Sequence, residues 1–408
     1  MRGLTRIFPL PLSPFQLSKA DKGLMLLSFT LAFCELFNIL GFSTFKINNV
    51  LMACLMAVSS LIYGLFRGAR FNGLYILYFV YLFINVALTN PPAVFQSWLR
   101  LGLFVVLLLC VAPVLQNKAM RKFRMQCFKY VMLLGVPLSV ISFACYFLGI
   151  NFIWSDFSHD VTVGGVFSGL FQNSMLLGPV SAVSSCYSFW AYYNTKSKWW
   201  IVLFVLCIGV CMFSSSRSAV YGAAVGCMSI MLFANRGTGK RIRQMLVVGI
   251  VACATFPLWQ GALTGINQKN AANELMGEYG SRTEKFEARI EEFGSSPVFG
   301  VGFAAINPHG RDAYNPRTGV VEPGSSWLAV LSMTGVLGFM FMLAIYVNAF
   351  FAAKRCASEY GALFAGLIAY LAFHELFEGY MLAAGSALCF ISWLIIGVAS
   401  DLKYAETD

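Results

Sequence analysis

Two arginines in this sequence lie in settings that suit an anionic ligand. Arg217 stands within Ser214-Ser215-Ser216-Arg217-Ser218, between two apolar runs, and the hydroxyls of Ser216 and Ser218 can donate hydrogen bonds to the same anion. A guanidinium near the bilayer usually faces a cavity or a partner. The alternative is a side chain that snorkels to anchor a helix end. The short, serine-rich connection favours anion binding.

Arg282 lies in a segment that predicts the start of a helix. Ser281-Arg282-Thr283-Glu284 has the form of a capping box, and Gly294 is placed to end the helix that follows. Three apolar residues recur at helical spacing and predict an amphipathic helix that packs on other helices, namely Phe286, Ile290 and Phe293. Arg282 would then occupy the first turn, where free amides and the helix dipole favour anions.

Further polar residues occur where apolar sequence resumes. Ser325, Ser326 and Trp327 follow Glu322-Pro323-Gly324 and suit a carbohydrate or phosphate group, although a helix cap with an interfacial aromatic ring explains them equally well. Four ionisable residues fall inside or at the ends of apolar runs, namely Glu35, His374, Glu375 and Glu378. Such residues serve as relays or substrate contacts, and ion pairs with Arg217 or Arg282 are an equally good explanation.

The composition requires that these residues be positioned by helices in a membrane. Of 408 residues, 58% are hydrophobic and 12% are charged, whereas soluble domains carry roughly 25% charged residues. A helix needs about 20 apolar residues to cross the hydrocarbon. Twelve runs approach that length: 24–42, 49–66, 72–89, 99–116, 129–149, 168–194, 199–213, 218–234, 245–261, 324–352, 360–376 and 380–399. The predicted fold is an all-α integral membrane protein of about 12 transmembrane helices.

The distribution of basic residues predicts the orientation of these helices. With both termini in the cytoplasm, the inner side carries 20 of the 29 Lys and Arg residues, as the positive-inside rule requires. The predicted organisation is a cytoplasmic segment 1–23, helices 1–9 in 24–261, one large periplasmic loop 262–323, helices 10–12 in 324–399, and a cytoplasmic tail 400–408. The net charge of +11 therefore reflects topology rather than nucleic-acid binding.

The order of these motifs resembles the bacterial O-antigen polymerase and O-antigen ligase superfamily. Those proteins have about a dozen spans, an outer-face serine–arginine motif, and one large periplasmic loop with an arginine, an aromatic residue and a Pro-x-x-Gly-x-Gly turn. The matching residues here are Ser216-Arg217-Ser218, Arg282, Phe286 in place of the usual tryptophan, Pro297 to Gly302, Leu328, Gly335 and Gly338, with Gly165-Val166-Phe167 through Asn173 upstream. The resemblance covers about 164–340 in motifs.

One departure bears on the activity that the resemblance implies. The ligase branch carries a histidine, thought to activate the acceptor hydroxyl, where this chain has Gly324. The polymerase branch varies there, so the resemblance favours a polymerase of undecaprenyl-diphosphate-linked repeat units. Glu322 and His309 are the candidate bases. Arg217 and Arg282, with Ser216 and Ser218, are expected to bind the diphosphate.

The remaining expectations follow from that resemblance. Candidate substrate-binding residues are Arg289, Ser325, Ser326, Trp327 and Asn173. No metal or other cofactor is expected, since diphosphate is already a good leaving group. The expected location is the bacterial inner membrane, with the lipid-linked oligosaccharide as substrate and a chain-length regulator and a flippase as possible pathway partners. A ligase that transfers glycan to lipid A–core or protein, and a polysaccharide transporter, are the alternatives.

Overall fold

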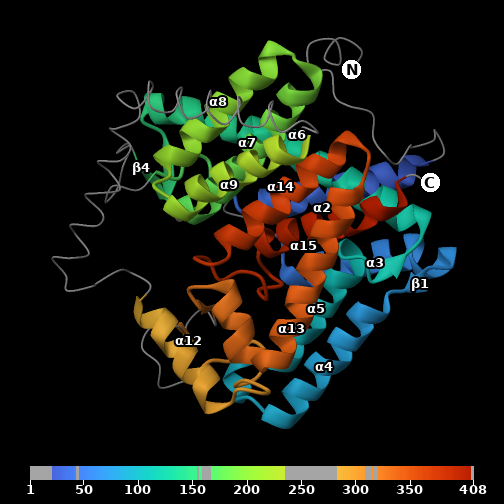
Figure 1. Ribbon diagram of the computed structural model, residues 1–408. Helices are drawn as coiled ribbons and strands as arrows, with labels where there is room; N and C mark the ends of the chain where they lie inside the picture. Colours follow the sequence, from blue (N-terminus) through green and yellow to red (C-terminus); the bar gives the residue numbers. More distant parts are fainter. Residues whose placement is uncertain are drawn as a thin grey trace.

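The protein is an all-helical bundle (Figure 1). The computed structural model describes residues 21–42, 46–153, 156–158, 167–234, 283–307, 314–315 and 320–405. The α-helices in these ranges are α2 (Lys22–Phe37), α3 (Asn49–Tyr63), α4 (Gly73–Thr89), α5 (Ser97–Val111), α6 (Lys118–Leu148), α7 (Ser174–Thr195), α8 (Lys198–Phe213), α9 (Arg217–Ala234), α12 (Thr283–Ser295), α13 (Ser326–Arg355), α14 (Glu359–His374) and α15 (Ala387–Asp401). The strands in these ranges form three short two-stranded antiparallel sheets: β1 (Arg70–Phe71) with β2 (Leu115–Gln116), β3 (Asn151–Ile153) with β4 (Asp156–Ser158), and β5 (Tyr314–Asn315) with β6 (Val320–Val321).

Helices occupy eleven of the twelve predicted apolar runs, and the run 245–261 lies outside the described residues. Within the described ranges, six helical segments are long and apolar enough to cross a membrane: Asn49–Arg67, Ala93–Val111, Lys118–Leu148, Arg217–Ala234, Ser326–Arg355 and Ala387–Tyr404. The helices α4 and α8 are apolar but shorter. The bundle is thus that of a membrane protein, while the count of twelve spans, their orientation and the loop 262–323 stay predictions.

Large apolar side chains cover the outside of this bundle. Leu77, Phe83, Leu133, Phe147 and Met340 each expose more than half of their surface. Exposed apolar area of this extent is unusual on a soluble protein but is what lipid tails require of a helix surface. The exposed residues and the apolar composition therefore have one common explanation.

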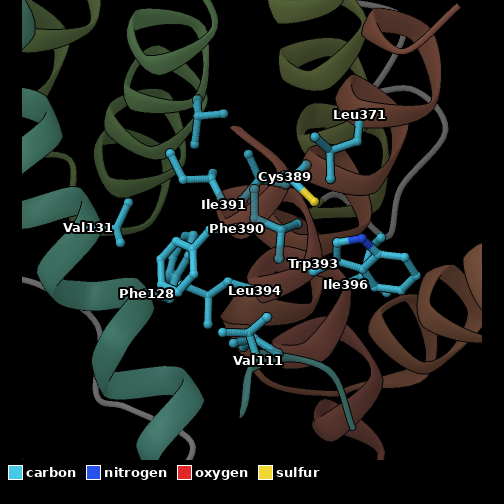
Figure 2. Packing of buried hydrophobic residues seen from close by; sticks show 14 of the residues in the cluster. Val111, Phe128, Val131, Leu371, Cys389, Phe390, Ile391, Trp393, Leu394 and Ile396 are labelled. Carbon is cyan, nitrogen blue, oxygen red and sulfur yellow. The ribbon is translucent and has the colours of Figure 1, made fainter. Parts of the chain in front are cut away.

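The centre of the bundle is α15, which other helices surround (Figure 1). Phe390, Trp393 and Leu394 on α15 are fully buried, and Figure 2 shows them packed among Val111, Phe128 and other apolar side chains. The indole N–H of Trp393 donates to the carbonyl of Met381 at 3.0 Å. This bond ties the centre of α15 to the turn that precedes it, so the turn is held from within the core.

The helix α13 is broken near its start. Gly335 has φ 64° and ψ −172°, a conformation that side chains rarely adopt. The segment 297–302 fills the break, because Val301 N donates to Ser332 O at 2.8 Å and Val336 N donates to Pro297 O at 2.9 Å. The Pro-x-x-Gly-x-Gly turn therefore supplies partners for backbone groups that an unbroken helix would have paired internally.

The helix α6 begins at Lys118, eleven residues before the predicted apolar run. The basic residues between 118 and 129 are thus helical rather than part of a loop. Arg124 is fully buried and bonds to both carboxylate oxygens of Asp401, at 2.7 and 3.0 Å. Sequence reasoning counted Arg124 only as a cytoplasmic charge, because its partner lies 277 residues away.

Candidate functional site

The serine–arginine motif forms the turn between α8 and α9. Ser214 is buried, Ser215 has a positive φ of 55°, and Arg217 is the first residue of α9. A left-handed serine is strained, and such strain is concentrated at functional sites. Because the N-terminal end of a helix carries partial positive charge, the guanidinium of Arg217 adds to a field that already attracts anions.

The start of α7 lies against this turn. A Cβ on Gly178 would come within 2.7 Å of the Cβ of Ser216, so the glycine permits close approach of the two segments. Asn173 is the residue before α7, and its side-chain oxygen accepts a bond from Leu176 N at 3.0 Å. The structure thus gives Asn173 a capping role, and its contact with substrate stays a prediction.

An acidic turn between α14 and α15 lies beside the same motif. The hydroxyl of Ser218 donates to Glu378 Oε1 at 3.2 Å. Tyr346 donates to Glu375 Oε2, and His374 Nδ1 lies 2.7 Å from the hydroxyl of Tyr380. These acids and the histidine are all more than nine-tenths buried. The sequence places these three residues together at the end of one apolar run, and the structure bonds Glu378 of this turn to Ser218, the residue after Arg217.

Ser325 and Ser326 hold the acidic turn from the start of α13. The Ser326 hydroxyl donates to Glu378 O at 2.6 Å and its amide donates to Glu375 O at 2.9 Å. Ser325 Oγ accepts from Leu328 N at 3.3 Å and so caps α13. Both serines are buried and hydrogen-bonded within the protein. Their observed role is to fix the turn that carries Glu378, and direct contact with a glycan stays a prediction.

Trp327 packs within the protein on one side. Its indole N–H donates to Ala372 O at 3.0 Å, and its ring lies 4.8 Å from that of Tyr346. The ring is half-buried. Trp327 therefore braces α13 against α14, and its stacking on a sugar also stays a prediction.

Two polar residues of α4 hold the 297–302 turn. Asn85 donates from Nδ2 to Phe299 O at 2.5 Å and accepts at Oδ1 from Phe303 N at 2.8 Å. Tyr81, one helical turn earlier, donates to Thr334 O at the break in α13. Sequence reasoning missed both residues. Their four-residue spacing on an apolar helix was the available signal, because it places two polar groups on one face.

The amphipathic helix α12 is present but presents a different face from the one predicted. Ile290 is 58% exposed, whereas Arg289 and Glu292 are buried. The expected packing of Phe286, Ile290 and Phe293 was therefore wrong for Ile290. The charged pair is buried because Glu292 Oε1 accepts from Asn307 N at 2.6 Å and lies 2.8 Å from Arg289 Nη2. In Figure 1, α12 lies beside α13 at the lower left of the bundle.

Burial shapes the electrostatics of this pair. It lowers the pKa of Arg289, while nearby Glu292 opposes that shift. It raises the pKa of Glu292, with Arg289 and the Asn307 amide opposing the change. Within the described residues, Nε and Nη1 of Arg289 have no hydrogen-bond partner. A buried guanidinium with open donors suits a further anionic or hydroxyl group, so substrate contact by Arg289 stays a reasonable prediction.

Of the two candidate bases, the structure describes Glu322 but not His309. Glu322 has a half-exposed side chain and lies 2.8 Å from Lys285 Nζ. His309 lies outside the described residues, as do Arg282 and the predicted capping box at 281–282. Gly324 has a φ of 79°, and a Cβ there would lie 2.9 Å from the Cβ of Lys285. The position of the ligase histidine is therefore closed to a side chain in this conformation.

A small cavity borders the acidic turn near Gly379. It has a volume of about 40 Å³, room for one or two water molecules. Its lining includes Arg100, Pro323, Ser326 and Gly379. The described residues contain no group of three or more His, Cys, Asp or Glu that could hold a metal ion.

One comparison with known proteins covers part of this site. A family model described as O-Antigen ligase matches residues 202–343. No curated protein matches the chain. The matched range runs from α8 through Arg217 to the break in α13, while the acidic turn with Glu375 and Glu378 lies beyond it. Over residues 202–343 the chain is therefore similar to the O-antigen ligase family.

Proposed function

We propose that this protein polymerises undecaprenyl-diphosphate-linked oligosaccharide repeat units into O-antigen, capsule or exopolysaccharide. The reaction would take place at the periplasmic face of the bacterial inner membrane. The observation that carries the proposal is the convergence at one end of the bundle of Arg217, the acidic turn bonded to Ser218, and the start of α13. The cationic helix start and the serine hydroxyls suit the diphosphate, and the nearby carboxylates can accept hydrogen bonds from sugar hydroxyls.

In the proposed reaction, the acceptor hydroxyl attacks the anomeric carbon of the growing glycan and undecaprenyl diphosphate leaves. Arg217 and Arg282, aided by Ser216 and Ser218, bind the diphosphate and stabilise the charge that develops on it. Arg289, Asn173, Ser325, Ser326 and Trp327 shape the surrounding site. Glu322 and His309 are the bases that the sequence nominates. Metal is not required, because two guanidinium groups can neutralise the leaving group.

A ligase is the second candidate, and the description of the matching family supports it. In that reaction lipid A–core or a protein supplies the acceptor hydroxyl. Gly324 weighs against this reading, since it removes the histidine that the ligase branch uses and leaves no space for it. A transporter would not need the serine–arginine motif and the loop turn in the order found here. A flippase and a chain-length regulator would act with a polymerase in the same pathway.

The test uses the full-length protein in proteoliposomes with a lipid-linked repeat unit as the only glycan. A polymerase lengthens the glycan without lipid A–core, and a ligase forms product only when lipid A–core is added. Arg217→Ala and Arg282→Ala should each abolish lengthening while the protein still inserts. Arg355→Ala is the matched control, because Arg355 is exposed at the other end of α13 and should keep full activity. Normal chains from both Arg217→Ala and Arg282→Ala would disprove the diphosphate site.

A further inference from the structure

The proposed function requires a group that takes the proton from the acceptor hydroxyl. Such a base must come within hydrogen-bond reach of the hydroxyl while the donor diphosphate is held by Arg217. The ligase histidine is absent, and Glu322 is already paired with Lys285. The structure offers another carboxylate, outside the range that the family model matches.

The backbone at Gly324 lies against the acidic turn. A Cβ on Gly379 would come within 3.2 Å of Gly324 N and would overlap the ring of Pro323. The chain segment that carries the base in the ligase branch is therefore in direct contact with the residue after Glu378. A carboxylate from this turn can reach the region that the ligase histidine would serve.

Glu378 is held firmly at this point. Its backbone carbonyl accepts from the Ser326 amide at 3.0 Å and from the Ser326 hydroxyl at 2.6 Å. Its Oε1 accepts from Ser218, the neighbour of Arg217, at 3.2 Å. The side chain is 8% exposed. The carboxylate thus lies between the proposed diphosphate site and the end of the loop, fixed by bonds from α9 and α13.

The other nearby acids fit the role less well. Glu375 is 1% exposed and accepts from Tyr346, so it faces the interior of the bundle. Glu322 has a side chain that is 53% exposed, and its Oε1 is already occupied by Lys285 Nζ at 2.8 Å. Glu378 alone among these three is bonded to the serine–arginine motif.

We propose that Glu378 is the general base that activates the acceptor hydroxyl, in place of the histidine of the ligase branch. The acceptor oxygen forms a bond to the anomeric carbon as the bond from that carbon to the diphosphate oxygen breaks. The electron pair of the broken bond leaves with undecaprenyl diphosphate. The acceptor proton passes to the Glu378 carboxylate and then to water, which restores the base. Ser218 orients the carboxylate by donating its single hydroxyl proton to Oε1, so in this state Ser216 rather than Ser218 is the serine that can donate to the diphosphate.

The decisive variant is Glu378→Gln, which keeps the shape and the acceptor for Ser218 but cannot take a proton. In the proteoliposome assay, kcat should fall by roughly 10²–10⁴-fold while KM for the lipid-linked donor stays within about threefold. Glu378→Asp should recover part of the lost rate. Glu359→Gln is the matched control, because Glu359 is an exposed acid in the first turn of α14, at the other end of that helix, and it should keep kcat within about threefold. Glu322→Gln is the competing variant, and a loss of rate there with normal activity in Glu378→Gln would move the base to Glu322.

The pH profile separates a base from a merely structural acid. The wild type should lose kcat/KM as pH falls and Glu378 becomes protonated, and Glu378→Gln should lack that limb. The titratable groups around the turn are His374, Glu375, Tyr370, Tyr380 and Tyr346, with Arg217 at the start of α9. If His374→Gln still loses kcat/KM as pH falls, the loss is not caused by protonation of His374.

The outcomes distinguish this inference from the proposed function. If wild-type protein fails to lengthen any lipid-linked glycan, the proposed function is wrong. If it does lengthen glycan and Glu378→Gln works at the wild-type rate, Glu378 is not the base although the polymerase stands. If Glu378→Gln strongly lowers the melting temperature, its loss of activity could come from unfolding, and Glu378→Asp becomes the deciding variant. Its kcat/KM must then rise with pH as that of the wild type does. A flat profile for folded Glu378→Asp overturns the inference.

Discussion

The two ends of the bundle treat buried charge in different ways. At the expected inner end, Arg124 and Asp401 form a two-bonded ion pair, and the guanidinium also donates to Ala112 O at 3.1 Å. At the expected outer end, Glu375 Oε1 and two nitrogens of Arg289 have no hydrogen-bond partner among the described residues. Complete pairing is typical of scaffold, whereas open donors and acceptors are typical of a site that binds something.

This contrast explains why we interpret two buried arginines differently, Arg124 as part of the scaffold and Arg289 as part of a binding site. A charge on a membrane helix is expensive wherever it lies. Arg124 offsets the cost by using its partners fully, so nothing remains with which to bind a ligand. At the expected outer end, Glu375 and Arg289 keep hydrogen-bonding capacity that the described residues do not use. We therefore expect inner-end substitutions to change stability and outer-end substitutions to change activity.

The largest effect on stability should come from breaking the inner pair. Asp401→Ala leaves the Arg124 charge buried without its carboxylate, which costs about 3–5 kcal/mol. The measurement is the thermal unfolding midpoint in detergent, with Lys403→Gln at the exposed end of the same segment as control. An Asp401→Ala protein as stable as the control would mean that the two ends are not different in kind.

The second-largest loss of stability should come from filling the break in α13. Gly335→Ala places a side chain at a φ of 64° against the backbone of Val298, so we expect a loss of at least about 1–3 kcal/mol. Lengthening activity should fall with it, because the 297–302 turn is seated in this break. Gly102→Ala, on open surface in α5, is the control. Retained stability and activity in Gly335→Ala would show that the break is not required.

These elements also show how far the sequence could lead. The apolar runs 199–213 and 218–234 predict α8 and α9 to within a residue, because lipid demands continuous apolar helices. The start of α6 could not be predicted, since basic residues before an apolar run look like a loop. The serine–arginine motif was recognisable from local sequence alone. An ion pair between Arg217 and the acids at 375 or 378 was one of the alternatives, but the bond from Ser218 to Glu378 could not be read from local sequence, because 160 residues separate the two.

A smaller loss is expected from Asn85, which the sequence analysis passed over. Asn85→Ala removes both bonds to the 297–302 turn and leaves the carbonyl of Phe299 without that donor, at a cost of about 1–3 kcal/mol. Activity should fall more than stability suggests, because the turn joins α12 to α13. Ile84→Ala, a neighbouring and partly exposed position, serves as control. Equal activity in Asn85→Ala and Ile84→Ala would show that the position of the 297–302 turn does not affect the active site.

The smallest effect should come from the exposed pair at the outer end. Lys285→Ala removes the partner of Glu322, whose side chain is half-exposed. Because an exposed ion pair contributes little, the free energy of unfolding should fall by no more than about 1 kcal/mol. The substitution keeps the Cβ, which is the atom of Lys285 nearest to a side chain placed at Gly324, so that close approach is unchanged. Lengthening activity should change little if Glu378 is the base, whereas Glu322 as base would work better once its ion pair is gone. A clear rise in rate for Lys285→Ala, reversed by adding Glu322→Gln, would move the base to Glu322. If Lys285→Ala lost as much stability as Asp401→Ala, ion pairs at the outer end would stabilise the fold as much as those at the inner end, and the contrast between the two ends would be wrong.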